Sequence, residues 1–260
     1  MVTEQGTFEF RLLGPLEAAR DGRTMPLGGP RVRGVLARLL VDVGRTVSVT
    51  ALVDELWGER APGDAHRTVR TYVSRLRRAL AGPPGEGCGP VLVTRPPGYQ
   101  LAVEPQALDA VRFERLATEG RRALATGRPG PALEVLTAAL ALWRGSALAE
   151  FEGLPAVGCE AVRLNALRLT VVEDRIEAAL ATGQHALLVG ELEGLVRAHP
   201  VRERLRGQLM IALYRSGRQA DALGAFQDAR TVLVHAYGVE PSPALAGIHQ
   251  RILRQEPDLT

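Results

Sequence analysis

The sequence contains no lysine, and all 32 of its strongly basic residues are arginines. The chain therefore has no side-chain amine for Schiff-base catalysis and none for a lysine-dependent phosphate-binding loop. A GC-rich genome also replaces lysine with arginine, so the absence is not by itself a functional signal. The absence of lysine excludes these two kinds of chemistry, and arginine is then the strongly basic side chain available to bind anions.

Catalytic and metal-binding patterns are missing as well. The sequence has no G-x-S-x-G, no G-x-G-x-x-G and no Walker-type loop. Its five histidines are scattered, and none has a metal-ligand spacing to a cysteine or to another histidine. We therefore expect no enzyme activity, no cofactor and no bound metal.

Cysteines and long apolar runs are scarce. Cys88 and Cys159 are far apart, which favours free thiols in a reducing compartment. No apolar run is long enough to span a membrane, and the first seven residues lack the basic start and apolar core of a signal peptide. These features predict a cytoplasmic protein with no membrane partner.

The chain has 260 residues and 46% hydrophobic residues, which is enough for two folded domains. Its positive charge is unevenly distributed. Residues 1–104 contain 14 arginines against 11 acidic residues, whereas residues 105–260 contain 18 of each. This division indicates a polyanion-binding domain followed by a neutral one.

The first part reads as a small antiparallel sheet, three helices and a hairpin. Alternating apolar residues predict strands within residues 8–12 and 16–27, with a hairpin turn at Asp21-Gly22. Apolar residues at helical spacing predict helices over 30–43, 50–57 and 64–80, with Ser48 or Thr50 capping the second. Strands at 91–94 and 99–103 follow. This order is typical of an α+β winged helix-turn-helix.

The third predicted helix concentrates arginine on one face. Its apolar face consists of Val69, Val73, Leu76 and Leu80. Arg67, Arg70, Thr71, Ser74 and Arg78 point the other way, with Arg75 on the flank, and no acid follows the candidate N-cap Asp64. A solvated surface helix is the alternative, but such helices usually mix charges. Hydroxyls between arginines suit contact with phosphates and base edges.

Two residues outside this helix are also candidates. Trp57, at the end of a short helix, belongs either to the core or to a rim from which its N–H reaches a phosphate. Arg95 lies at the predicted hairpin tip with no local acid, a position that favours contact with a narrow minor groove.

Residues 105–260 read as helices broken by glycine and proline. Gly183 and Gly217 are 34 residues apart, which is the tetratricopeptide period, and Gly127 has a similar setting. Small and large apolar residues follow each glycine at matched offsets: Ala132, Leu136 and Ala139; Leu188, Leu192 and Leu195; Ala222, Phe226 and Ala229. We expect an all-α, tetratricopeptide-like domain, with a plain helical bundle as the alternative.

Several motifs together resemble one family. Residues 68–78 (TVRTYVSRLRR) and 93–99 (VTRPPGY) resemble the winged helix of OmpR/PhoB-type regulators. With LWG at 56–58, the chain resembles more specifically the Streptomyces antibiotic regulatory protein family. Residues 113–116 (FERL), 141–145 (ALWRG) and 213–220 (LYRSGRQA) resemble the bacterial transcriptional activator domain of that family.

The resemblance implies a winged-helix DNA-binding domain over residues 1–104 and a transcriptional activator domain over residues 105–260. It implies an activator that binds direct repeats in double-stranded promoter DNA beside a second protomer. Such an activator recruits RNA polymerase holoenzyme, through its sigma factor and alpha subunit, to a secondary-metabolite biosynthetic cluster. The chain looks like the short form of the family, without ATPase or sensor domains.

The resemblance also assigns roles on DNA. It implies base contacts for Arg70, Thr71 and Arg75, although OmpR/PhoB-type relatives often carry an acid where Arg70 stands. It implies backbone contacts for Arg67, Thr68, Arg77, Thr94 and Arg95, with the Trp57 indole near the backbone. Ser74 and Arg78 join the backbone or groove group because they share the polar face.

A rival interpretation gives the helical half the main role. In it, the protein is a tetratricopeptide-type adaptor or a ligand-sensing protein whose contact with DNA is secondary. The charge division favours the DNA-binding activator. A salt titration of duplex binding separates the two interpretations, because phosphate contacts weaken steeply with salt.

Overall fold

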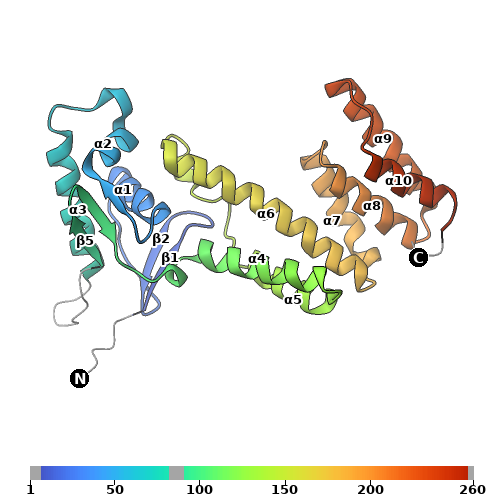
Figure 1. The fold of residues 1–260 in the computed structure, drawn as a ribbon, viewed down its shortest axis with the longest axis horizontal. Coiled ribbons are helices and arrows are strands. Elements are labelled where there is room, and N and C mark those ends of the chain that lie inside the picture. The colour runs from blue at the N-terminus through green and yellow to red at the C-terminus, as the bar shows by residue number, and fades with distance from the viewer. Residues whose placement is uncertain (1–6, 82–90, 257–260) are drawn as a thin grey trace. The chain divides into compact units, whose positions relative to one another are not determined.

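The computed structural model describes residues 7–81 and 91–256, which divide into two compact units (Figure 1). The first unit comprises residues up to 116 together with 138–169, and the second comprises 117–137 together with residues from 170 onward. The divisions fall within three helices: α4 (Asp109–Ala125), α5 (Pro129–Leu140) and α6 (Pro155–Ala181).

The chain begins with an antiparallel sheet of β1 (Phe8–Arg11), β2 (Glu17–Arg20) and β3 (Arg23–Thr24). Asp21 and Gly22 join β2 to β3 with φ values of 50° and 76°. Positive φ at both central residues is the geometry of the type I′ hairpin turn, for which Asp-Gly is well suited. The predicted turn is confirmed.

Three helices follow: α1 (Pro30–Val41), α2 (Val49–Trp57) and α3 (Ala65–Ala81), with a 3-10 turn at Gly58–Arg60 after α2. The Ser48 hydroxyl accepts the Ala51 N–H at 3.0 Å, so Ser48 is the N-cap of α2. The four residues predicted for the apolar face of α3 are all buried, and α3 packs against α1 and α2.

The wing is a second antiparallel sheet in the order β4 (Thr46–Ser48), β6 (Gly98–Leu101), β5 (Leu92–Arg95). Tyr99 and Leu101 are buried in it. Gly98 pairs with Ser48, and a Cβ added at Gly98 would lie 1.8 Å from the Val47 carbonyl oxygen. Only glycine allows the two strands to approach this closely.

Replacing Gly98 with alanine should therefore destabilise the wing. We expect Gly98→Ala to lower the free energy of unfolding by about 1–3 kcal/mol, the usual cost of overpacking. Gly63→Ala is the matched control, because a Cβ there meets no atom within 4 Å. Equal melting temperatures for the two variants in thermal denaturation would show that the strands can separate without cost.

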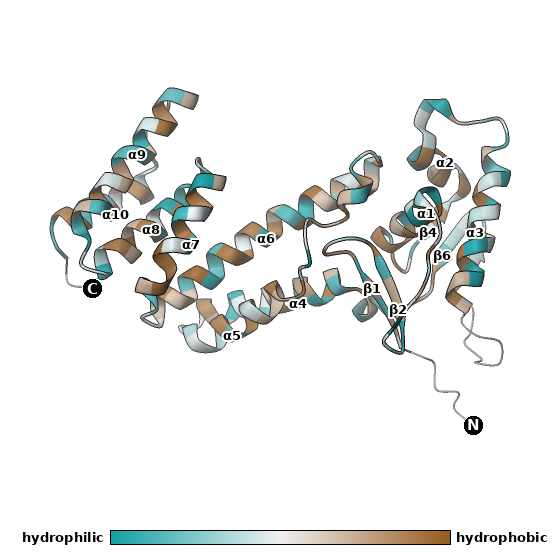
Figure 2. Cartoon of the chain, turned by 180° about the vertical axis from the view of Figure 1, so that it is seen from behind, coloured by the Kyte–Doolittle hydropathy of each residue, from teal (hydrophilic) through white to brown (hydrophobic). Residues whose placement is uncertain are grey.

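The rest of the chain is helical and is built from hairpins. After α4–α5 come α6–α7 (α7, His185–Ala198) and α8–α9 (Glu203–Arg215 and Gln219–Tyr237), followed by α10 (Pro243–Leu253). Gly127, Gly183 and Gly217 lie in the three hairpin turns, with φ between 69° and 82°. The matched apolar residues after them are buried, except Leu195, which is half-buried. Hydrophobic and hydrophilic residues alternate along these helices in Figure 2. The winged helix-turn-helix and the tetratricopeptide-like helical part are thus both confirmed.

Residues beyond 104 contribute to the first compact unit through buried polar contacts. The Asp109 carboxylate, at the start of α4, accepts the N–H groups of Leu12 at 2.7 Å and Leu13 at 3.2 Å. Burial raises the pKa of Asp109, while these N–H groups and the Arg144 guanidinium act in the opposite direction. The backbone N–H of Arg144 in turn donates to the Leu13 carbonyl at 2.8 Å.

Two further carboxylates make similar links. The buried Glu55 of α2 accepts the N–H groups of Ala156 and Val157, the first turn of α6, at 3.2 and 3.0 Å. Glu55 therefore caps a helix about 100 residues away in the sequence. Glu150 accepts the Leu16 N–H at 2.8 Å and receives two hydrogen bonds from Arg33, at 2.9 and 2.6 Å.

These contacts bear on the boundary predicted after residue 104. They join residues on both sides of it, and the compact unit that holds the winged helix also includes residues 138–169. The boundary remains a prediction about where the chain separates into independently folding parts.

The Glu150 contact predicts a dependence of stability on pH. Burial by itself would raise the pKa of Glu150, but the hydrogen bonds from Arg33 and from the Leu16 N–H outweigh it, and the pKa is lowered from 4.5. The ionised Glu150 carboxylate therefore stabilises the folded protein above about pH 4.5, and this contribution is lost as the pH falls through the lower pKa of the folded state.

We expect Glu150→Gln to melt below the wild-type protein at pH 6 and the gap to shrink toward pH 3 in thermal denaturation. The exposed Glu152 supplies the control, and Glu152→Gln should leave no such gap. A gap for Glu150→Gln that stays constant from pH 6 to pH 3 would contradict the assigned role of the carboxylate.

Candidate nucleic-acid interface

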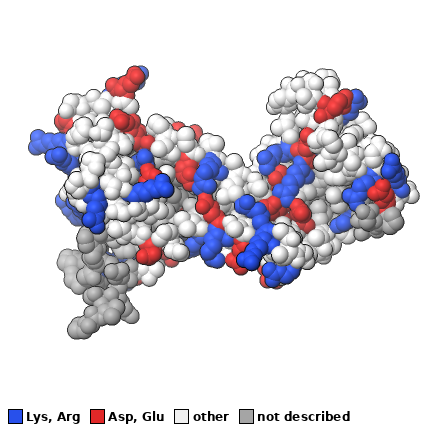
Figure 3. Space-filling model, in the orientation of Figure 1, with Lys and Arg blue, Asp and Glu red and all other residues white. Residues whose placement is uncertain are grey.

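The polar face of α3 carries two parallel rows of side chains. Arg67, Thr71 and Arg75 are spaced four residues apart, as are Arg70, Ser74 and Arg78, so each row runs along the helix axis. All six residues are exposed. In the orientation of Figure 3, basic side chains project along the edge of the molecule that α3 forms.

The arginines of these rows are not neutralised by any residue that the structure describes. Neither an ion pair nor a hydrogen bond links the guanidinium groups of Arg67, Arg70, Arg75 or Arg78 to the residues that the structure describes. The same holds for Arg95 at the end of β5. An exposed group of unpaired guanidinium ions is suited to an anionic partner, above all a phosphate backbone.

The hydroxyl groups on α3 are held locally. Thr71 Oγ1 donates to the Arg67 carbonyl at 3.2 Å, and Thr68 Oγ1 donates to the Asp64 carboxylate at 3.3 Å. Each hydroxyl oxygen keeps lone pairs that can accept a hydrogen bond from a base edge. The base-reading roles of Arg70, Thr71 and Arg75 and the groove role of Ser74 stay predictions, which this exposed placement allows.

Arg77 differs from the other arginines of α3, because its guanidinium contacts the wing. Its Nε donates to the Leu92 carbonyl at 2.9 Å, and a terminal nitrogen donates to Thr94 Oγ1 at 2.7 Å. Its Cζ lies 5.7 Å from the centre of the Tyr99 ring, within the range of a cation–π contact. The structure thus shows that Arg77 links the wing to α3. A phosphate contact by Arg77, as predicted, would require its guanidinium to bind the phosphate while it also holds the wing.

Trp57 is half-buried in a stack of side chains. Its ring lies 6.3 Å from the Tyr72 ring on α3, and the Arg31 guanidinium lies 5.2 Å from its centre. The indole nitrogen is buried and has no hydrogen-bond partner among the described residues. The indole therefore packs between side chains of α1 and α3 at the end of α2. To donate its N–H to a phosphate, the ring would have to move.

The wing presents Thr94 and Arg95 to solvent. Thr94 Oγ1 accepts from Arg77, so its own O–H remains able to donate to an external acceptor. Arg95 precedes the tight Pro96-Pro97 connection to β6. The two residues lie where a groove or backbone contact would be made, and that contact remains a prediction.

Arg31, Tyr72 and the anchoring role of Arg77 were not found from the sequence. Arg77 and its partners are separated by 15 to 22 residues, and Arg31 and Trp57 by 26, so no local pattern reports these contacts. The sequence shows no acid near Arg77, but that absence is as compatible with a contact to an external phosphate as with an anchoring role inside the protein.

The anchoring role can be tested by comparing neighbouring arginines. Removing Arg77 leaves the Leu92 carbonyl and Thr94 without their donor, so Arg77→Ala should destabilise the wing by about 1–2 kcal/mol. Hydrogen exchange of the β5 amides should accelerate. Arg78→Ala is the control and should leave β5 exchange unchanged. Identical exchange in both variants would remove the anchoring role from Arg77.

Metal-binding groups and membrane-spanning helices do not emerge from the described residues. No group of three His, Cys, Asp or Glu side chains within residues 7–81 and 91–256 could hold a metal ion. In the same ranges, none of the helices has both the length and the apolar character needed to cross a bilayer. Cys159 is an exposed free thiol, as predicted, while Cys88 lies outside the described residues.

Comparisons with protein families and known proteins agree with this architecture. Residues 25–101 match the family model described as "Transcriptional regulatory protein, C terminal". Residues 108–253 match the model described as "Bacterial transcriptional activator domain". The first range holds α1 to β6, including α3 and the wing, and the second holds the helices from α4 to α10.

Relatives cover nearly the whole chain. It is 41% identical over 255 residues to the regulatory protein DnrI of Streptomyces peucetius, covering 96% of this chain and 94% of that protein. It is 44% identical to the regulatory protein AfsR of Streptomyces coelicolor over 98% of this chain, which spans only a quarter of the length of AfsR.

A solved structure shows the same fold. The structure of Mycobacterium tuberculosis EmbR in complex with a low-affinity phosphopeptide matches with a TM-score of 0.92 and 39% identity. The match covers 97% of this chain and 66% of that one. From the two family matches and the near full-length similarity to DnrI, the chain belongs to the Streptomyces antibiotic regulatory protein family of transcriptional regulators.

Proposed function

We propose that this regulator is a sequence-specific activator that binds direct repeats in promoter DNA and recruits RNA polymerase. The observation that carries the proposal is the pair of exposed rows on α3, whose arginines have no ion-pair partner among the described residues. In winged-helix proteins the corresponding helix lies in the major groove, where arginine recognises guanine.

Within this proposal the contacts divide by position. Arg70, Thr71 and Arg75 read bases, while Arg67, Thr68, Ser74 and Arg78 contact phosphates or groove walls beside them. Thr94 and Arg95 hold the wing against the adjacent backbone or minor groove. Trp57 and Arg77 act from behind this surface, because their side chains are engaged with Tyr72 and Tyr99.

The partners in this proposal are those that the family resemblance implies. Two protomers bind adjacent direct repeats, and the sigma factor and alpha subunit of the polymerase holoenzyme are the partners recruited. The regulated genes form a secondary-metabolite biosynthetic cluster, and the protein acts in the cytoplasm, where that DNA is found. The relatives named above are regulators, which supports a regulatory and not a catalytic role.

Base reading and backbone contact are separable by two variants of α3. A bidentate arginine–guanine contact is worth about 1–3 kcal/mol of discrimination. We expect Arg75→Ala to lose about that much affinity on a selected duplex and to relax preference at one or two positions, with non-specific binding nearly intact. Arg78→Ala should weaken both kinds of binding, keep the preferred sequence and lower the salt slope by about one.

The measurement is selection of preferred sites by each variant, paired with affinities on specific and scrambled duplexes over a range of salt. Arg78 is the right comparison because Arg77 is committed to the wing. If both variants lost affinity equally on every sequence, Arg75 would be a phosphate contact, and base reading would pass to Arg70 and Thr71. Binding that did not weaken with salt would favour the rival adaptor or ligand-sensing role.

A further inference from the structure

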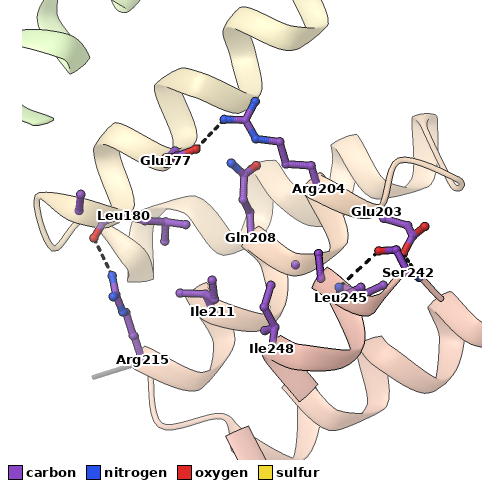
Figure 4. Close-up of a pocket in the computed structure, with 13 residues that line it drawn as sticks. Glu177, Leu180, Glu203, Arg204, Gln208, Ile211, Arg215, Ser242, Leu245 and Ile248 are labelled. Atoms are coloured by element: carbon purple, nitrogen blue, oxygen red, sulfur yellow. Dashed lines mark hydrogen bonds and ion pairs between the residues drawn. The ribbon is translucent and has the colours of Figure 1, made fainter. Parts of the chain in front are cut away.

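The second compact unit contains a pocket of about 480 Å³. It is bounded by the end of α6, the inner face of α8 and the first turns of α10 (Figure 4). Its apolar surface comes mainly from Leu180, Ile211, Leu245 and Ile248. Pockets of this size that are apolar with a few polar groups are typical of sites for small organic molecules.

The charged groups that line this pocket are already bonded within the chain, and Arg215 donates to the Leu180 carbonyl at 2.8 Å. Arg204 forms ion pairs with Glu173, Asp174 and Glu177, as Figure 4 shows for Glu177. Glu203 accepts the Ser242 N–H at 2.7 Å. A charged ligand would have to break one of these interactions or lie beside a group of the same sign. The electrostatics therefore favour an uncharged ligand.

One polar group in the pocket wall lacks a partner. Gln208 is only 6% exposed, and its Nε2 donates to the Glu173 carbonyl at 2.7 Å, which fixes the orientation of the amide. Its Oε1 is buried without a hydrogen-bond partner among the described residues. Buried acceptors are nearly always paired, so this oxygen lacks a donor that a bound molecule would supply. The oxygen has under 1 Å² of accessible surface, so the ligand's donor reaches it only when the side chains that cover it move.

We propose that this pocket binds an uncharged, largely apolar small molecule that carries a hydrogen-bond donor for Gln208 Oε1. The apolar surface supplies affinity, and the glutamine selects the molecule by its donor. The proposal goes beyond promoter binding, because it concerns the helical part of the chain and can be tested without DNA.

Three probes of the same shape separate the contributions. Naphthalene is apolar, 2-naphthol adds an O–H donor, and 2-naphthoate adds a negative charge. Each is titrated into the full chain while NMR follows the methyl groups of Ile211 and Ile248. We expect 2-naphthol to shift both with a dissociation constant of about 1 mM or tighter, near the affinity usual for so small a ligand. Naphthalene and 2-naphthoate should bind at least threefold more weakly.

Two variants and a control locate the binding. Gln208→Met keeps the side-chain length but removes the acceptor, together with the Nε2 donor to the Glu173 carbonyl, which lies outside the ligand contact. It should weaken 2-naphthol about threefold to tenfold and leave naphthalene unchanged. Ala244→Trp, at an exposed position on the pocket rim, should block all three probes. Ala220→Trp, exposed on α9 and outside the pocket lining, should block none.

Several outcomes would overturn the proposal. They are no shift of either methyl group up to the solubility limit of each probe, equal binding of 2-naphthol and 2-naphthoate, and equal loss of naphthalene and 2-naphthol in Gln208→Met. Binding that survived Ala244→Trp would place the ligand elsewhere. None of these outcomes depends on DNA binding, so failure here is distinguishable from failure of the proposed promoter contact.

Discussion

The burial of one face of α3 is the constraint from which the interface follows. Val69, Val73, Leu76 and Leu80 are each at most 2% exposed. Burying such side chains contributes roughly 1.5–3 kcal/mol each, so rotation of α3 about its axis would be costly. With that face held against α1 and α2, the helical period leaves the arginine rows in solvent. The interface is therefore the outer side of a core element.

The same logic extends to the wing and to α2. Arg77 links β5 to α3, and the Arg31–Trp57–Tyr72 stack links the start of α1, the end of α2 and the middle of α3. Arginine thus has two uses on neighbouring positions of one helix. Where the described residues supply acceptors and an aromatic ring, the arginine fixes the geometry of the wing. Where they supply none, the arginine is exposed and available to an external anion.

Carboxylates bring residues of the activator region into the first compact unit. Asp109, Glu55 and Glu150 each accept backbone N–H groups from a segment at least 90 residues away. Asp109 and Glu55 are buried, which is costly for an acid unless it is hydrogen-bonded, and the N–H groups meet that requirement. The winged helix is consequently supported by more of the chain than its own sheet, helices and hairpin.

Much of the fold could be predicted because its signals are local. The Asp21-Gly22 turn, the Ser48 cap, the dry face of α3 and the apolar offsets after Gly127, Gly183 and Gly217 each depend on a few neighbouring residues. The roles of Glu55, Trp57 and Arg77 depend on partners far along the sequence, which periodicity does not register. Which arginine reads a base depends on the DNA, so those assignments remain predictions even with every side chain placed.

Methylation interference on a selected duplex tests most directly whether the polar face of α3 lies in the major groove. Guanine N7 faces the major groove and adenine N3 the minor groove, so methyl groups at the two positions report different contacts. We predict that N7 methylation at one or more guanines in each direct repeat blocks binding, and that Arg75→Ala is insensitive to one or two of these methyl groups. Binding that is insensitive to N7 methylation and blocked only by N3 methylation would contradict the placement of α3 in the major groove.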